Sequence, residues 1–331
     1  MHFRFTYASR LSVLVAVFAF HIHAQAVSGS TNAPSAMWSS QNVQHAYGLP
    51  QAKPNDKGTL TVTSEGVSFT GKAERFTIQR PSVIAVSAGN QRVELWGMKG
   101  RLLRMAIPDG GGLAAAGVMQ HRVDTLTVEF SDSKGGYHGA VFLLPANEAE
   151  RAVESFFRVA VVQHEFPSVT CQDSTIKPKS VLVSFPDWEK SEVPAAYRVL
   201  VYEHLIDRLA HIDGISHVYR DGEDRGPGVC PQYTIHIAVT GFKQGSQVQR
   251  AVTGPVGFFV GTTQMGFDTT ITDASGKLHA QEHIKAAARG ESESTKVADT
   301  VAKNLAKHYS KVEKTFEQIT MVNSESTTRL Y

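Results

Sequence analysis

The stretch VDTLTVEFSDSKGGYHGAVFLL (residues 123–144) decides the fold of the first half of this 331-residue chain. Two runs of alternating apolar and polar residues, 123–130 and 137–144, flank the polar, glycine-containing segment 132–136. Alternation on both sides of a short turn is typical of an antiparallel β-hairpin. We therefore expect two paired strands that belong to a larger sheet.

Short runs of the same kind recur upstream at spacings of about ten residues, which favours an antiparallel barrel or sandwich. A turn at Gly89 and Asn90 separates the last two of these runs. Pro145 closes the final strand, and apolar residues at helical spacing then predict a helix over 146–162. Together these elements predict a β-domain over 57–162. The expected upstream strands are 58–63, 66–71, 74–79, 82–88 and 92–97.

The succession of seven short strands and one C-terminal amphipathic helix resembles a pleckstrin-homology-like, or GRAM-like, domain. The resemblance implies a β-barrel closed by the helix. Members of that family that bind inositol phosphates do so through a basic first hairpin loop. The corresponding loop here is Ser64-Glu65, which is short and acidic, so the resemblance brings no lipid site.

The segment IPDGGGLAAAGVMQH (107–121) interrupts the strand pattern with an irregular glycine-rich loop. Gly110, Gly111 and Gly112 are candidate binding residues, because a loop of this kind can act as a flap over a small apolar ligand. A flexible connection without a ligand is the other interpretation.

The second half of the chain mixes helical and strand patterns. After a linker over 163–179, the pattern predicts the order β-α-β-β-β-β-α over 180–316, followed by a tail over 317–331. Such an order predicts an α+β domain in which helices cover one face of a mixed sheet. The expected strands are 180–185, 217–220, 232–242, 266–273 and 277–288, and the expected helices are 194–211 and 295–316.

Several glycines and turns of this half match a known family. They include Gly241-Phe242, Arg250-Ala251, the turn DASGKL (273–278) and the helix segment AKNLAK (302–307). With the strand and helix over 181–219, they resemble the bacterial envelope family called domain of unknown function 4410. The resemblance implies a fold like the periplasmic modules of TolB and of curli-secretion lipoproteins, which act in assembly and interaction. It brings no catalytic residues.

The stretch RAVTGPVGFFVG (250–261) holds the candidate binding residues of this half. A glycine-rich stretch followed by Gly-Lys suggests a nucleotide-binding loop, and Gly276-Lys277 follows this one. That motif needs a hydroxyl residue directly after Gly-Lys, whereas Lys277 is followed by Leu278, so we expect no nucleotide site. The aromatic pair can form an exposed tip that touches lipid or a protein partner, or it can fold back over the sheet. The glycines suit bends at strand ends. The candidates are Gly254, Gly257, Phe258, Phe259 and Gly261.

The run HAQEH (279–283) matches the inverted zinc-protease motif. On a helix, His279 and His283 would share a face and bind Zn²⁺, with Glu282 as general base. On a strand the two histidines would lie about 13 Å apart, which is too far for one ion. The run follows a tight turn after an alternating strand, so we expect a strand and no metal site.

The N-terminus predicts a cleaved signal peptide over 1–26. Arg4 and Arg10 provide its basic region, LSVLVAVFAF (11–20) its apolar core, and AQA (24–26) the cleavage site. The apolar core is too short to span a bilayer comfortably, which favours cleavage over a retained anchor. We therefore expect an exported bacterial protein, periplasmic or secreted, with no transmembrane span in the mature chain.

Charge and cysteine content narrow the function classes. Arg4 and Arg10 account for the whole formal charge of +2, and a neutral mature chain has no electrostatic footprint for nucleic acid. An exported protein with two cysteines is expected to pair them, here Cys171 with Cys230, and two buried free thiols are the alternative. The polar residues 27–56 are expected to form a flexible lead-in.

We therefore expect a non-enzymatic binding or assembly module of the bacterial envelope, acting on a protein partner or on further copies of itself. It would present sheet edges and glycine loops to that partner, for example by strand addition. No cofactor is expected. A carrier of an apolar ligand or lipid, and a zinc-dependent hydrolase acting through HAQEH, are the alternatives.

Overall fold

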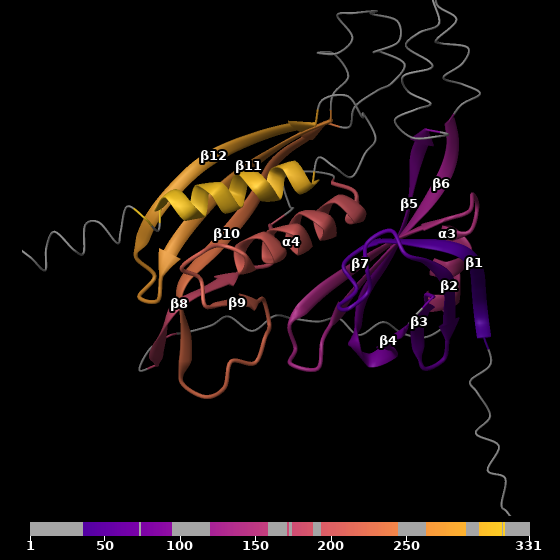
Figure 1. Ribbon diagram of the computed structural model, residues 1–331, viewed down its shortest axis with the longest axis horizontal. Coiled ribbons are helices and arrows are strands. Elements are labelled where there is room, and N and C mark those ends of the chain that lie inside the picture. The colour runs from indigo at the N-terminus through magenta and orange to yellow at the C-terminus, as the bar shows by residue number, and fades with distance from the viewer. Residues whose placement is uncertain are drawn as a thin grey trace, which may run out of the picture. The chain divides into compact units, whose positions relative to one another are not determined.

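The computed structural model describes residues 36–72, 74–94, 120–157, 171, 174–187, 193–243, 263–288, 298–312 and 314 (Figure 1). These residues form a seven-stranded antiparallel sheet, a five-stranded mixed sheet and three α-helices. Among them, no helix is both long and apolar enough to cross a membrane.

The first sheet has the strand order β4-β3-β2-β1-β7-β6-β5, and every neighbouring pair in it is antiparallel. The antiparallel sheet predicted from the alternating runs is therefore confirmed. A 3₁₀ turn, η1 (Arg80–Ser82), joins β4 to β5. The strands are β1 (Ala36–Tyr47), β2 (Lys57–Thr63), β3 (Gly66–Thr70), β4 (Arg75–Gln79), β5 (Val83–Glu94), β6 (Gln120–Ser131) and β7 (Tyr137–Leu144).

Strand β1 corrects the prediction for residues 27–56. The composition of that segment predicts a flexible lead-in, but Ala36–Tyr47 forms a strand in the middle of the sheet, between β2 and β7. Val43 and His45 lie two residues apart, so they share a face, and both are fully buried. A register shift between Ser40 and Val43 breaks the alternation along β1, which is why the sequence pattern conceals this strand.

Strand β5 also differs from the prediction, because no turn occurs at Gly89 and Asn90. The two residues lie within one continuous strand and pair with Thr125 and Asp124 of β6. A Cβ atom on Gly89 would lie 2.6 Å from the hydroxyl oxygen of Thr125. The glycine therefore makes room for a side chain of the neighbouring strand and does not mark a bend.

The buried His45 fastens the segment after β1 onto that strand. Its Nδ1 lies 3.1 Å from the carbonyl oxygen of Lys53, and the backbone N–H of Leu49 donates to its Nε2 over 3.1 Å. A carbonyl only accepts and a backbone N–H only donates, so the ring is neutral with its proton on Nδ1. Burial lowers the pKa of His45, against the opposing effect of the backbone hydrogen bonds with Lys53 and Tyr47 and of the Asp56 charge.

Helix α3 (Ala149–Phe157) follows the first sheet and packs into its core. The Asp124 carboxylate of β6 accepts hydrogen bonds from the backbone N–H groups of Glu148 and Ala149, at 2.9 and 3.1 Å. Such bonds satisfy donors that a helix N-terminus leaves unpaired. The helix predicted over 146–162 is observed from Ala149 to Phe157; a turn at residues 146–147 precedes it, and residues 158–162 lie outside the described part.

The second sheet has the order β12-β11-β10-β8-β9. Strand β8 is parallel to both β9 and β10, and the remaining pairs are antiparallel. The predicted order of elements is confirmed, although β8 begins at Thr175, inside the predicted linker over 163–179. The strands are β8 (Thr175–Val183), β9 (His217–Arg220), β10 (Val229–Lys243), β11 (Thr263–Asp273) and β12 (Leu278–Ala288).

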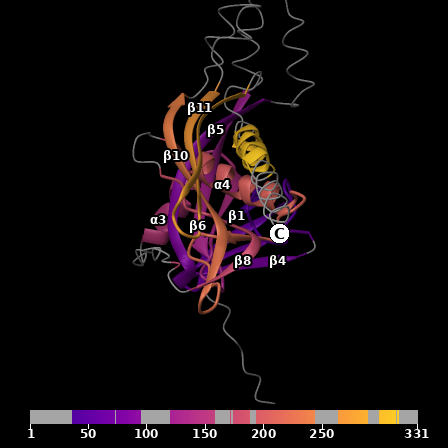
Figure 2. The ribbon, with the colours of Figure 1, turned by 90° about the vertical axis from the view of Figure 1, so that its left-hand side faces the viewer.

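Two helices lie on the same face of this sheet, as Figures 1 and 2 both show. They are α4 (Ala195–Ala210) and a C-terminal helix over 298–312. Both contribute to one core with β10, β11 and β12, in which Leu205, Phe267 and Leu305 are buried. The predicted mixed sheet with helices on one face is therefore observed.

A disulfide joins Cys171 to Cys230, as predicted. Cys230 lies on β10 and is 1% exposed, and Cys171 precedes β8, which is the parallel neighbour of β10. The bond therefore holds the chain that enters the second sheet against one of its central strands.

Replacing both cysteines by alanine should lower the free energy of unfolding. The bond links residues 59 positions apart, and closing a loop of that length restricts the unfolded chain by about 4 kcal/mol at most. Urea unfolding of the mature chain measures the loss. Reduction of the wild-type protein should produce a similar loss, and an unchanged midpoint in both experiments would contradict the assignment.

Candidate functional site

All eight predicted binding residues lie outside the part of the chain that the structure describes. These are Gly110, Gly111 and Gly112 of the first glycine-rich loop, and Gly254, Gly257, Phe258, Phe259 and Gly261 of the second. Their roles as a ligand flap or a partner-binding tip therefore remain predictions.

The HAQEH run lies on strand β12, as expected, and not on the helix that the zinc-hydrolase alternative requires. His279 and His283 each contact a different carboxylate. The His279 Nε2 lies 2.7 Å from Asp273, and the His283 Nδ1 lies 2.7 Å from Asp268. Glu282 forms an ion pair with His308 of the C-terminal helix.

The Asp273 carboxylate organises the turn between β11 and β12. It accepts hydrogen bonds from the backbone N–H groups of Ser275 and Lys277, and from the Ser275 hydroxyl at 2.6 Å. Burial raises the pKa of Asp273, but the bonds from Ser275, His279 and Lys277 outweigh it and lower this pKa to about 2. His279 therefore has a structural partner at the hairpin.

Successive residues of a strand point to opposite faces, so Glu282 and His283 cannot act on one ion. Within the described residues, no group of three or more histidine, cysteine, aspartate or glutamate side chains is placed to hold a metal. The arrangement of HAQEH can therefore stabilise a hairpin and a helix contact, and it offers no hydrolytic geometry.

The feature of β12 that does suit binding is its open edge. The strand pairs with β11 along its whole length, from Thr263↔Ala288 to Thr272↔Leu278. It is the last strand of the sheet, and no described strand pairs with its other side. It runs for 11 residues without a proline. An edge of this length that no described strand pairs with presents a row of backbone donors and acceptors to another extended chain.

A second polar cluster is buried where β7 meets α4 and β9. Strand β1 pairs with β7 only from Val141 to Leu143, so the backbone groups of Tyr137 and Gly139 need other partners. The Tyr137 N–H donates to the carbonyl oxygen of Asp221 over 2.8 Å. The Gly139 N–H donates to the Glu203 carboxylate over 2.9 Å. Residues of α4 and of the turn after β9 thus complete this edge of the first sheet.

Glu203 and Arg220 form the charged centre of this junction. Both guanidinium nitrogens of Arg220 donate to the two carboxylate oxygens of Glu203, at 2.9 and 2.8 Å. The Arg220 Nη1 also donates to the Tyr137 carbonyl oxygen over 2.9 Å. The Glu203 side chain is 4% exposed, and a buried charge of this kind is stable only when it is paired and hydrogen-bonded.

A neighbouring carboxylate, Glu129 of β6, faces the same helix. The Tyr137 hydroxyl donates to it over 3.0 Å, and Arg198 of α4 lies 3.6 Å from it. Burial raises the pKa of Glu129, and Arg198 and Tyr137 oppose that rise. Burial also raises the pKa of the Tyr137 hydroxyl. The hydroxyl therefore keeps its proton and remains a donor to Glu129.

The hairpin tip between β6 and β7 closes on the second sheet as well. The Asp224 N–H donates to the carbonyl oxygen of Lys134 over 2.7 Å. A Cβ atom on Gly135 would lie 2.8 Å from the carbonyl oxygen of Gly222. Gly135 has a φ of +82° and Gly222 a φ of +74°, a region that glycine adopts without strain. The close approach of the two turns therefore depends on the missing side chain of Gly135, and both turns use a backbone conformation that suits glycine.

Sequence reasoning missed this junction. The sequence predicts a helix over 194–211 that contains Val199, Leu200 and Leu205, with nothing to indicate that Glu203 between them is buried. The available signal was that apolar residues occur on more than one side of the helix, which is typical of a helix covered on two faces.

Substituting Arg220 by alanine should lower the free energy of unfolding by about 3–5 kcal/mol, because it leaves the buried Glu203 charge without its partner. Urea unfolding measures the change. Arg75→Ala on the exposed surface of β4 is the control, with an expected change within about 0.5 kcal/mol. Arg220→Lys keeps the charge and serves if the alanine variant does not fold. An Arg220→Ala loss no larger than the control's would contradict the assignment.

Acidification below pH 6.5 should destabilise the protein through its buried neutral histidines. Burial lowers the pKa of both His45 and His138 below the ordinary value of 6.5. For each histidine, at a pH between its pKa in the folded chain and its higher pKa in the unfolded chain, the unfolded chain binds the proton and the folded chain does not. The free energy of unfolding therefore falls as the pH falls. Glu129 changes the free energy of unfolding in the opposite direction. Its pKa is raised in the folded state, so the folded chain binds this proton more readily than the unfolded chain as the pH falls.

Unfolding free energies measured between about pH 7 and pH 5 should therefore decline less steeply in His45→Gln than in the wild type. His211→Gln, at an exposed position after α4, should keep the wild-type slope. If the glutamine variant does not fold, nuclear magnetic resonance of the His45 ring gives its titration directly. A midpoint at or above the ordinary histidine value would contradict the prediction.

No family model matches the chain, and no curated protein matches it either. Among solved structures, a PelC dodecamer and a variant of it from Paraburkholderia phytofirmans are 17% and 16% identical, with TM-scores of 0.23 and 0.24. Each alignment covers 43% of this chain, and 91% and 93% of the PelC chains.

A protein of the family domain of unknown function 330 from Xanthomonas campestris is 12% identical, with a TM-score of 0.27 over 43% of this chain and 91% of that one. Likeness at this level carries no argument about function. The resemblances to domain of unknown function 4410 and to pleckstrin-homology-like domains stay predictions.

Proposed function

We propose that this protein is an exported bacterial envelope protein without catalytic activity, which binds other proteins through the open edge of β12. The observation that carries the proposal is the unpaired side of this strand, 11 residues long and free of proline. A partner strand laid along it would gain backbone hydrogen bonds for affinity, and the alternating side chains would give specificity.

The two faces of β12 differ in a way that suits such a partner. Ile284 and Ala286 point into the core and are 8% and 3% exposed. Gln281, His283 and Lys285 alternate with them and are exposed. An added strand would therefore extend both the apolar and the polar face of the sheet. The strand is also held rigidly, because β11 pairs along it and His308 of the C-terminal helix contacts Glu282.

Export is part of the same proposal, through the predicted signal peptide over 1–26. The Cys171–Cys230 bond supports it, since disulfides persist in oxidising compartments. The division into a pleckstrin-homology-like domain over 57–162 and an envelope-family domain over 180–316 also belongs to the proposal. Both halves would then serve to present the binding edge.

Two proline variants at consecutive positions test the binding edge. In a strand, neighbouring residues direct their N–H groups to opposite sides. Of Gln281→Pro and Glu282→Pro, one therefore removes a hydrogen bond to β11 and the other removes an N–H from the open edge. We expect the first variant to lose about 1 kcal/mol or more of stability. The second should keep wild-type stability and lose the protein complex.

Native mass spectrometry of the protein, taken gently from an envelope extract without reductant, measures the complex. Gln281→Ala and Glu282→Ala are the matched controls, because they alter the same side chains and keep both N–H groups. A wild-type monomer that carries one zinc ion or one lipid would overturn the proposal. So would a stable proline variant that keeps every complex of the wild type.

A further inference from the structure

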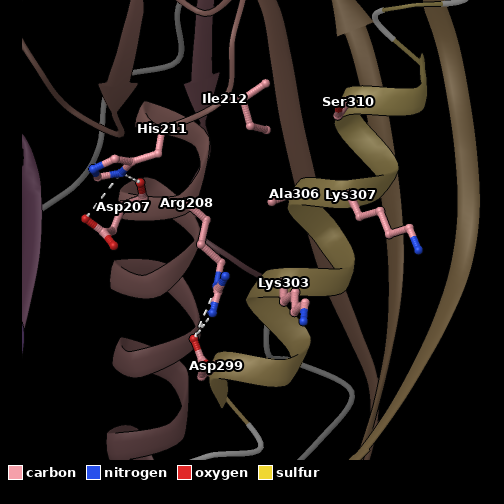
Figure 3. A pocket seen from close by; sticks show the side chains of 9 residues that line it. All are labelled: Asp207, Arg208, His211, Ile212, Asp299, Lys303, Ala306, Lys307 and Ser310. Atoms are coloured by element: carbon pink, nitrogen blue, oxygen red, sulfur yellow. Dashed lines mark hydrogen bonds and ion pairs between the residues drawn. The ribbon is translucent and has the colours of Figure 1, made fainter.

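A pocket of about 500 Å³ lies between the end of α4 and the C-terminal helix (Figure 3). Cavities of this size accommodate small molecules. Ile212 and Ala306 give it an apolar base, and its remaining lining is polar or charged. The polar lining residues are Asp207, Arg208, His211, Asp299, Lys303, Lys307 and Ser310.

Arg208 is held in place by one hydrogen-bond partner, and some of its N–H donors remain unused in the part of the chain that the structure describes. Its Nε donates to Asp299 over 3.2 Å, and its Nη2 contacts the same oxygen, so the two side chains point toward one another across the gap between the helices (Figure 3). A guanidinium has five N–H donors in a planar fork. The remaining ones have no acceptor among the described residues, and the side chain is 33% exposed.

Lys303 and Lys307 add positive charge to the same lining. They are four positions apart on the helix over 298–312, so they project from successive turns of one face. Both are exposed, and neither ammonium group has a carboxylate partner in the part of the chain that the structure describes. Ser310 follows one turn after Ala306 and adds a hydroxyl donor at the same rim.

The two carboxylates of the pocket are already engaged. Asp299 is neutralised by Arg208. Asp207 accepts a hydrogen bond from the Tyr47 hydroxyl, and His211 Nδ1 lies 2.6 Å from its backbone carbonyl oxygen. After these pairings, the two lysines and the unused donors of Arg208 remain for a ligand.

We propose that this pocket binds a phosphate group carried by a small molecule or by a lipid headgroup. Arg208 and the two lysines line the same pocket, although Figure 3 shows the Lys307 side chain extended away from Arg208. A guanidinium fork together with ammonium groups on flexible stems suits the oxygens of a phosphate, which accept several charge-assisted hydrogen bonds at once. The volume leaves room for an organic portion over Ile212 and Ala306. The site lies on the helices and does not depend on the binding role of the β12 edge.

Isothermal titration calorimetry of the wild-type protein at low ionic strength tests the site, with glycerol 3-phosphate as ligand and glycerol as its uncharged match. A second arm measures binding to phosphatidylcholine vesicles with and without phosphatidylglycerol. The test variant is Lys303→Gln with Lys307→Gln. The control is Lys57→Gln with Lys72→Gln, which removes the same charge from exposed positions outside the pocket and outside β12.

We expect the pocket variant to weaken binding by about tenfold or more, and the control variant to bind like the wild type. Loss of glycerol 3-phosphate binding would identify a soluble ligand class, and loss of vesicle binding alone would identify a lipid headgroup. The proposal is overturned if the wild type binds neither probe. It is equally overturned if both variants lose affinity to the same extent, or if the pocket variant loses none.

Discussion

The structure depends on how the backbone of β7 is satisfied where β1 stops pairing with it. A buried N–H or carbonyl without a partner costs about 1–3 kcal/mol, and β7 is buried along nearly all of its length. Helix α4 and the end of β9 supply the missing partners: the Glu203 carboxylate for Gly139, and Asp221 and Arg220 for Tyr137. The Glu203–Arg220 ion pair is thus both a stabilising contact and the means by which one sheet completes the other.

Helix α4 is the element that makes this possible. It shares a core with β10 and β11 of the second sheet, and with Tyr137 and Val141 of β7. A Cβ atom on Gly139 would lie 2.5 Å from the methyl groups of Val199. The helix therefore packs directly on the backbone of the strand, and the same closeness brings Glu203 within hydrogen-bonding distance.

Much of the fold follows from the sequence because alternation and helical spacing are local properties. The hairpin of 123–144 and the order of elements in the second half were predictable in this way. The disulfide was predictable from a different signal, the presence of two cysteines in a chain expected to be exported. Strand β1 was not, because a register shift and an outer face of serine and glutamine conceal its pattern. Gly89 was misread because a glycine that makes room for Thr125 looks like one that makes a turn.

The junction around Glu203 and Arg220 was even harder to predict from the sequence. Nothing local distinguishes Glu203 from a solvent-exposed acid on a helix, since its burial is set by β7, more than sixty residues earlier. The strand at HAQEH, by contrast, was predictable from the turn before it. Sequence thus located β12, but only the sheet order shows that it is the last of the described strands in its sheet.

The long-range junction also imposes an order on folding. The hydrogen bonds from β7 to Glu203 and Arg220 span 64 and 83 residues of sequence. A chain made from its N-terminus therefore holds the strands of the first sheet before the groups that complete β7 exist. Contacts of high sequence separation form late and slow the whole process. Until α4 and β9 have been synthesised, β7 therefore lacks part of its hydrogen-bond partners. During that interval the strand is most prone to pair with another chain.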